Sequence, residues 1–213
     1  MKIDILTLFP KMFEGPFRES IIKRAQDKSL VEIKIHNLRK WGLDDRRTVD
    51  DRPYGGGSGM ILRIDVIDAA ISDLRSKIKD LKSKIILLDA TGEKFNQQKA
   101  IQLSKLEHLI LIAGHYEGVD HRVHEHLVDE VISIGDYVLT GGELPAMVVI
   151  DSIVRLIPGV VGKEASIVEE SHSKPGYLEY SQYTRPEEYK GWRVPEVLLS
   201  GNHKKIKNWR QAG

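Results

Sequence analysis

The chain has 213 residues, of which 41% are hydrophobic and 30% charged, which suits one large domain with or without a small appendage and excludes a disordered or fibrous protein. It has no cysteine, which excludes disulfides and thiolate metal sites and is typical of a reducing compartment. Its net charge of +1 does not by itself indicate a nucleic-acid partner.

The N-terminal stretch is apolar, but Asp4 interrupts it and Pro10 follows, so it is typical of a β-strand rather than a signal peptide. No apolar run approaches the roughly 18 residues that a membrane-spanning helix needs. We therefore expect a cytoplasmic protein that does not enter a membrane.

Two strands, a helix and a long loop are predicted in the first part of the chain. Residues 3–8 fit a strand, 15–28 a helix, and 31–35, where apolar and charged side chains alternate, a second strand. From 41 to 60 the periodicity is lost and Asp, Arg and Gly predominate. Long loops within compact domains are usually functional or disordered, so this loop is a candidate binding element.

Beyond this loop, short apolar runs alternate with helices. The runs cover 84–89, 108–113 and 131–135, and the expected helices cover 64–78, 96–106 (capped by Asn96), 119–127 and 143–156. This alternation predicts βαβ units and a parallel sheet. Ligands bind such sheets outside the carboxyl ends of the strands. We therefore expect the small-molecule site among three polar, glycine-rich segments, Asp89–Gly92, Gly114–Gly118 and Gly135–Tyr137.

The character of the chain changes after the last of these helices. Residues 162–184 are polar and typical of a linker or mobile loop, whereas 186–210 have helical potential, with Trp192 and Trp209 as expected packing anchors. The last stretch, 201–213, carries cations and no acid: Lys204, Lys205, Lys207 and Arg210. It indicates either a phosphate-contacting element or a solvated helix face.

Two common nucleotide-binding motifs are missing. The sequence has no G-x-G-x-x-G after a strand and no P-loop, which argues against a dinucleotide dehydrogenase and a P-loop NTPase. The loop instead has glycine at four of the five positions 55–59, so its backbone can approach a ligand closely. Arg52 adds a cation and Tyr54 a stacking face, a pairing that suits an unstacked base. A flexible solvent loop is the equal alternative.

A second informative stretch, 133–145, ends a strand, loops and begins a helix near Gly142. Glycines at this point allow close approach to the helix N-terminus. Tyr137 and Leu139 have the right character to sandwich a flat ring such as adenine. The alternative is a tight connection in which glycine serves as punctuation.

Three groups of polar residues allow more than one interpretation. Asp151 and Arg155 are spaced as an intrahelical ion pair, but the arginine can also face a substrate or a subunit boundary, because so apolar a helix must be buried in the core or in a dimer. Glu169 and Glu170 are either solvated or supply a general base. A solvated helix is a better interpretation than a metal site for His115, His121, His124 and His126.

Taken together, these segments resemble the bacterial tRNA (guanine-N1)-methyltransferases of the SPOUT superfamily, the knotted methyltransferases. The matching stretches follow one another through nearly the whole chain, at 8–13, 47–57, 114–120, 133–139, 141–147, 157–160, 183–186 and 195–203. Several of them are too long for chance agreement.

The resemblance implies an α/β fold in which a parallel sheet flanked by helices contains a deep trefoil knot, a rare feature. It implies a knotted methyltransferase domain over 1–161, a flexible linker over 162–178 that is not ordered without tRNA, and a small helical tRNA-binding domain over 179–213. Relatives continue past Trp209 with more helix, so we expect this last domain to be truncated. The resemblance also implies a homodimer with each active site at the subunit interface.

The resemblance places S-adenosylmethionine in the knot, held largely by backbone groups. The residues expected around it are Leu88, Gly114, Tyr116, Glu117, Ile134, Gly135, Asp136, Tyr137, Val138, Leu139, Gly141, Gly142 and Pro145. The expected tRNA contacts are Asp51, Arg52, Tyr54, Gly55, Gly56, Gly57, Asn202 and His203. A need for magnesium is also implied, but no carboxylate cage is evident and we assign no metal ligand.

The implied reaction is methyl transfer to ring nitrogen N1 of the guanine at tRNA position 37. This nitrogen carries a proton, so a carboxylate must accept it and a cation should stabilise the negative charge on the neighbouring carbonyl oxygen. Glu170 matches the family base, which is usually aspartate, and Arg155 matches the family arginine. The guanine must leave its stack, and Tyr54 is a candidate to receive it. Two rivals are a knotted methyltransferase with a ribose target and a non-catalytic RNA-binding protein.

Overall fold

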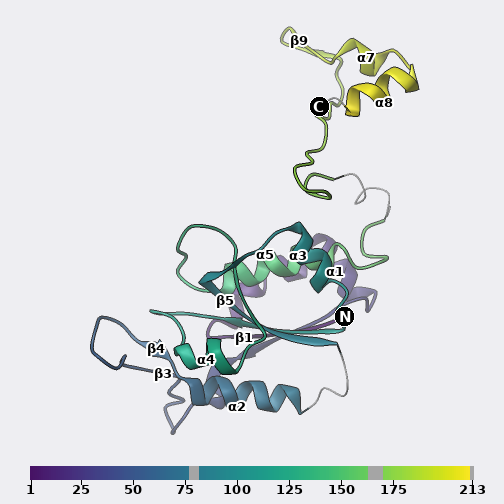
Figure 1. Cartoon of the computed structure of the whole chain (residues 1–213). Helices are drawn as coiled ribbons and strands as arrows, with labels where there is room; N and C mark the ends of the chain where they lie inside the picture. Colours follow the sequence, from purple (N-terminus) through teal and green to yellow (C-terminus); the bar gives the residue numbers. More distant parts are fainter. Residues whose placement is uncertain (77–81, 163–169, 212–213) are drawn as a thin grey trace. The chain divides into compact units, whose positions relative to one another are not determined.

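A computed structural model of the chain describes residues 1–76, 82–162 and 170–211 (Figure 1). The chain divides into two compact units, Met1–Gly162 and Lys163–Gly213, which are described separately. In the described residues, no helix is both long enough and apolar enough to cross a membrane.

The first unit is built on a five-stranded parallel sheet with strand order β2-β1-β6-β5-β7. The strands are β1 (Lys2–Thr7), β2 (Glu32–Asn37), β5 (Ser83–Lys94), β6 (His108–Ala113) and β7 (Glu130–Ser133). The predicted parallel α/β sheet is therefore confirmed. One bound was wrong, because β5 runs five residues past the apolar run to Lys94, with a register shift against β7 between Leu88 and Glu93.

Helices cover both faces of this sheet (Figure 1). One face packs against α1 (Ser20–Asp27), α3 (Gln97–Leu103) and α5 (Glu143–Val154), and the other against α2 (Ile64–Arg75) and α4 (His121–His126). The central strand β6 is covered on both sides, so every one of its residues is buried, and all those after His108 are apolar. The carboxyl ends of the strands remain for a ligand.

Local sequence explains where several helices begin. The predicted cap of α3 is confirmed, since the Asn96 side chain accepts a hydrogen bond from the Lys99 backbone N–H at 2.9 Å. The helix predicted from residue 15 begins only at Ser20, because Pro10 and Pro16 each start a short 3-10 turn before it, η1 (Pro10–Phe13) and η2 (Pro16–Arg18).

The predicted loop at 41–60 follows a third 3-10 turn, η3 (Leu38–Trp41), and contains little regular structure. Leu43 and Thr48 form an isolated antiparallel bridge within it, and β3 (Asp50–Asp51) pairs with β4 (Ile61–Leu62) as a short antiparallel ribbon. The ribbon pins the two ends of the glycine-rich tip, which leaves the tip exposed.

A buried polar network crosses three neighbouring strands of the sheet. The Asp4 carboxylate on β1 is 1% exposed and accepts hydrogen bonds from His36 Nε2 on β2 at 2.5 Å and from His108 Nε2 on β6 at 2.6 Å. Lys2 Nζ lies 3.3 Å from the same carboxylate. Burial raises the pKa of Asp4, but the two histidine hydrogen bonds and the Lys2 charge outweigh it and hold this pKa well below its usual range.

The second unit is small and only partly helical. It contains a hairpin of β8 (Glu188–Tyr189) and β9 (Trp192–Arg193), followed by α7 (Glu196–Leu199) and α8 (His203–Gln211). The helical potential assigned to 186–210 was wrong at the hairpin, where Lys190 and Gly191 adopt φ of 53° and 84° and close a tight turn. Within the linker predicted over 162–178, residues 163–169 lie outside the described residues, and its disorder without tRNA stays a prediction.

One of the two predicted tryptophan anchors is confirmed. The Trp209 ring on α8 lies 6.3 Å from the rings of both Tyr180 and Tyr183. Trp192 instead lies in the hairpin with 71% of its surface exposed, so its prediction as an anchor was wrong.

Candidate active site

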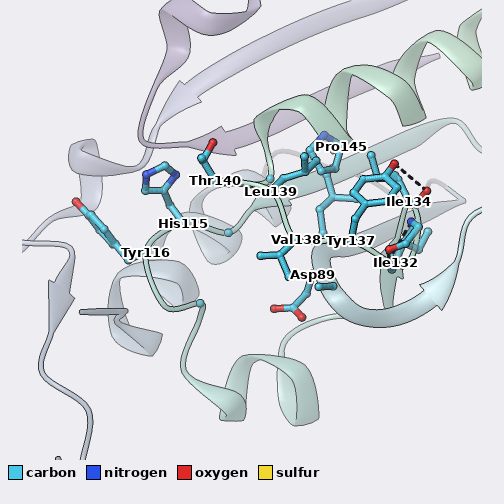
Figure 2. A pocket seen from close by; sticks show the side chains of 18 of the residues that line it. Asp89, His115, Tyr116, Ile132, Ile134, Tyr137, Val138, Leu139, Thr140 and Pro145 are labelled. Carbon is cyan, nitrogen blue, oxygen red and sulfur yellow. Dashed lines mark hydrogen bonds between the residues drawn. The ribbon is translucent and has the colours of Figure 1, made fainter. Parts of the chain in front are cut away.

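A pocket of about 200 Å³ lies at the carboxyl ends of β6 and β7 and beside the point where the register of β5 against β7 shifts (Figure 2). It is formed by residues of 88–90 within β5, 114–118 after β6 and 132–142 from the end of β7 onward, together with Pro145 on α5. The three strand ends proposed from the sequence are thus brought together, because β5 is hydrogen-bonded to both β6 and β7.

Twelve of the thirteen residues predicted around the cofactor line this pocket, and Asp136 does not. The Asp136 side chain is mostly exposed and forms an ion pair with Lys94 at the end of β5. Lining residues that the sequence prediction did not include are Asp89, Ala90, His115, Gly118, Ile132, Ser133 and Thr140.

Backbone segments approach closely in the wall between β6 and α5. The Gly142 N–H donates to the Gly114 carbonyl at 2.7 Å, and His115 and Gly141 form an isolated antiparallel bridge. A Cβ on Gly142 would lie 2.6 Å from the Ala113 Cα, which is too close for two non-bonded carbon atoms. The glycines before α5 therefore allow the two segments to pack closely, and they also leave their own backbone groups exposed to the pocket.

The loop after β7 contributes apolar side chains to the pocket. The Tyr137 ring folds back over Gly135, where an added Cβ would lie 2.3 Å from a ring carbon, and its hydroxyl donates to the Ile134 carbonyl at 3.3 Å. Val138 is 87% exposed, and Leu139 is also partly open to solvent. Figure 2 shows these side chains around the cavity with Pro145. Apolar side chains and free backbone groups at one place suit a flat heterocycle with polar edges.

The turn after β6 forms the opposite part of the lining. Tyr116 adopts φ of 62°, a left-handed conformation that is unusual for a residue other than glycine. The turn is held by the Gly118 N–H, which donates to the His115 carbonyl, and by the Glu117 N–H, which donates to the Met60 carbonyl, both at 3.1 Å. Through Met60 this turn contacts the end of the glycine-rich loop.

The glycine-rich loop borders a second, more polar pocket beside the N-terminus of α4. Three predicted tRNA-contacting residues, Asp51, Arg52 and Tyr54, line it, and Tyr54 is fully exposed. Arg63 bridges Asp51 and Asp65 at 2.9 and 2.7 Å. The hydrogen bond from Arg63 lowers the pKa of the Asp65 carboxyl. The remaining predicted loop residues follow Tyr54 with positive φ but do not line the pocket: Gly55, Gly56 and Gly57.

A family model described as tRNA (Guanine-1)-methyltransferase TrmD matches residues 1–213. The chain belongs to this family. The resemblance seen in the motifs is confirmed, and as a member of the TrmD family the chain is a methyltransferase.

Individual relatives agree with this assignment over nearly the whole chain. The tRNA (guanine-N(1)-)-methyltransferase of Bacillus subtilis (strain 168) is 57% identical over 210 residues, which cover 99% of this chain and 86% of that protein. The protein of the same name from Dictyoglomus turgidum is 55% identical, with 99% of this chain and 84% of that protein covered. The one from Citrifermentans bemidjiense is 53% identical with the same coverage.

Membership in the TrmD family implies S-adenosylmethionine as the methyl donor. The pocket at the strand ends fits this molecule, because its lining combines apolar side chains with backbone donors and acceptors at glycines, which have no Cβ to cover them. Bound there, S-adenosylmethionine would supply a methyl group activated by its positively charged sulfur.

The two residues matched to the TrmD family's catalytic groups lie in different compact units. Arg155 follows the last turn of α5, where its backbone N–H donates to the Asp151 carbonyl at 3.3 Å. Glu170 begins the described part of the second unit, and its carbonyl accepts a hydrogen bond from the Ser173 N–H at 3.0 Å.

A basic groove lies in the second unit between α8 and the segment 173–180. Its described lining includes three cations, Lys174, Lys207 and Arg210, and no acid. The Arg210 guanidinium lies 4.7 Å from the centre of the Tyr180 ring. His203 also lines this groove, whereas Asn202 caps α8 by accepting a hydrogen bond from the Lys205 N–H at 3.1 Å.

The histidines of α4 are partly packed rather than uniformly solvated. His121 and His126 are exposed, but His124 is mostly buried, with Nε2 3.6 Å from Asp89, and its ring stacks on that of His121. Within 1–76, 82–162 and 170–211, no three His, Asp or Glu residues are grouped so that they could hold a metal ion.

Proposed function

We propose that this chain transfers the methyl group of S-adenosylmethionine to N1 of the guanosine at position 37 of tRNA. The observation that carries the proposal is the pocket formed by segments 88–90, 114–118 and 132–142, because it lies where parallel sheets bind ligands and collects twelve of the predicted cofactor residues. The TrmD family and the names of its relatives support the tRNA guanine as substrate.

The cofactor would be held mainly by the chain's backbone. The loop before α5 places glycines where backbone N–H and C=O groups are reachable, and Leu88, Ile134 and Leu139 offer apolar surface for the adenine. Since these contacts are made by a packed crossing of chain segments rather than by long side chains, the pocket is preorganised for binding.

The proton on guanine N1 must leave as the new bond to the methyl carbon forms. We assign Glu170 as the carboxylate that takes this proton and Arg155 as the cation that stabilises the negative charge on the guanine carbonyl oxygen. As the methyl carbon bonds to N1, its bond to sulfur breaks. The glutamate is one methylene longer than the family's usual aspartate.

Two surfaces are suited to the RNA. The pocket beside the glycine-rich loop offers Arg52 and the exposed Tyr54 ring to an unstacked base. The groove in the second unit offers three cations and the tyrosines at 177 and 180 to phosphates and bases, which supports residues 179–213 as a tRNA-binding domain.

The proposal includes a trefoil knot and a homodimer. Residues 113–115 and 141–142, far apart in sequence, are in close contact where the resemblance places the knot. On α5, Leu144 and Val148 are 47% and 45% exposed although the helix is strongly apolar, and Met12 on η1 is also exposed. Apolar surface of this kind favours a subunit interface. The need for magnesium and the cytoplasmic location stay predictions.

The direct test uses S-adenosylmethionine labelled in the methyl group. After incubation with tRNA, the RNA is digested to nucleosides, and we expect the label in 1-methylguanosine. Label in a 2′-O-methyl nucleoside would favour the rival with a ribose target. Retention of tRNA without any transfer would favour the non-catalytic RNA-binding protein.

A further inference from the structure

A buried carboxylate lies directly behind the candidate cofactor pocket. Glu143, the first residue of α5, is 1% exposed, and its Oε1 accepts a hydrogen bond from the Thr7 hydroxyl at 2.7 Å. The Thr7 oxygen in turn accepts from the Phe9 N–H at 2.9 Å. Glu143 therefore joins the end of β1 to the start of α5.

The other carboxylate oxygen of Glu143 faces the pocket wall. Oε2 lies 3.7 Å from His115 Nδ1, a buried nitrogen for which no hydrogen-bond partner is found in the described residues. The backbone of Gly141 passes beside both groups, since a Cβ there would lie 2.4 Å from that nitrogen and 2.5 Å from Oε2. The Phe9 ring, 4.7 Å away, packs against the imidazole on another side.

A carboxylate is costly to bury, so its surroundings must favour the charge. The N-terminus of α5 contributes a positive potential at Glu143. The Thr7 hydroxyl and the imidazole of His115 complete these surroundings. A glutamine of the same shape would keep the Thr7 contact but would lose the attraction for the imidazole.

His115 begins the turn in which Tyr116 is held at φ 62°. A residue in such a conformation is strained and persists only where the surrounding structure over-determines it. Backbone hydrogen bonds hold the turn at Glu117 and at Gly118, whose carbonyl also accepts from the Leu62 N–H at 3.0 Å, and a fixed imidazole at the start of the turn adds a further constraint.

We propose that Glu143 is a positioning residue for the cofactor pocket. Its buried carboxylate fixes the His115 ring, and through that ring it holds the turn 115–118 in the shape that binds S-adenosylmethionine. This inference rests on the proposed function and adds to it two residues, Glu143 and His115, that were not among the predicted cofactor contacts.

The test is a double-mutant cycle read by calorimetric binding of S-adenosylmethionine. Glu143→Gln should raise the Kd roughly tenfold, within the range found for residues in contact. His115→Ala should raise the Kd by a similar factor, and adding Glu143→Gln to it should change the Kd no further. A general structural role would instead weaken binding by the same factor in both backgrounds, and that result, or an unchanged Kd for Glu143→Gln alone, would overturn the proposal.

Glu130→Gln on β7 is the matched control. Its carboxylate is partly buried and paired with Lys84 and Lys99, outside the pocket, so its loss should leave the Kd unchanged. If Glu143→Gln does not fold, His115→Gln must by itself raise the Kd roughly tenfold, and an unchanged Kd would overturn the inference. Wild-type protein that binds no S-adenosylmethionine would instead contradict the proposed function.

Discussion

At the scale of single residues, Asp4 links stability to pH. Its carboxyl pKa is depressed in the folded protein, so the stabilisation it provides is present above the ordinary aspartate pKa of about 4 and is lost as the pH falls below it. We expect Asp4→Asn to lower the free energy of unfolding at pH 7 by about 3 kcal/mol, since His36 and His108 lose a buried charged partner.

Urea unfolding of the wild-type protein and of Asp4→Asn between about pH 3 and pH 7 measures this effect. The wild-type protein should lose stability in acid more steeply than Asp4→Asn. Equal slopes for the two proteins would show that Asp4 does not carry the acid sensitivity.

A substitution at Gly142 tests the close contact between the segments 113–114 and 141–142 in the pocket wall. A methyl group there meets the backbone of Ala113 and Gly114 at 2.6–2.7 Å, and backbone cannot rotate out of the way. Gly142→Ala should therefore cost about 1–3 kcal/mol of stability and weaken S-adenosylmethionine binding. Gly15→Ala is the control, because no atom lies within 4 Å of its added Cβ. Thermal unfolding and calorimetry compare the two, and equal behaviour would refute the role of the crossing.

A substitution at Glu170 tests its assignment as the general base. Glu170→Gln keeps the size of the side chain but cannot accept the N1 proton, so the methyl-transfer rate at saturating substrates should fall about 10²–10⁴-fold. Affinity for S-adenosylmethionine should stay as in the wild type. Full activity of the variant would remove Glu170 from the mechanism and would favour a ribose target.

Local motifs in the sequence indicated where the pocket lies, because polar, glycine-rich segments follow apolar runs at this place. The twelve predicted residues that line it were given by the family resemblance, and their contact with the cofactor stays a prediction. Prediction from the sequence failed where partners are distant, as for Thr7 and Glu143, which are 136 positions apart. The sequence did contain one signal, because Glu143 begins a strongly apolar helix. Glutamate is almost never fully buried unless it is paired, so a partner for Glu143 could have been expected.

At the scale of elements, the alternation of apolar runs and helices correctly predicted the parallel sheet. The extension of β5 was missed because its last residues are polar and exposed, so hydrophobic periodicity cannot detect them. The hairpin in the second unit was missed for a similar reason, since its four strand residues are all exposed. Burial patterns reveal elements only where a core exists.

At this scale we predict that one face of helix α5 forms the subunit interface. Leu144 and Val148 are exposed at the i and i+4 positions of one face, whereas its opposite face is buried in the core. The double variant Leu144→Glu and Val148→Glu should convert the expected dimer into a monomer, measured by sedimentation velocity. Leu43→Glu, at an exposed leucine outside this face, should leave the dimer intact. A dimer that survives the double variant would exclude this face as the interface.

At the scale of the whole molecule, the proposed function combines a cofactor pocket in the first unit with cationic and aromatic surfaces in both units. The pocket would supply the donor site, the loop with Tyr54 a surface for an unstacked base, and the groove at Lys207 and Arg210 contacts for RNA phosphates. A protein that only binds RNA would not need the cofactor pocket.

The measurement that tests this account most directly compares two tRNA transcripts that differ only at position 37. One carries guanine and the other adenine, and each is incubated with the protein and methyl-labelled S-adenosylmethionine. We expect label in the guanine transcript alone. Label in both transcripts, or in neither while both are bound, would contradict methyl transfer to N1 of that guanine.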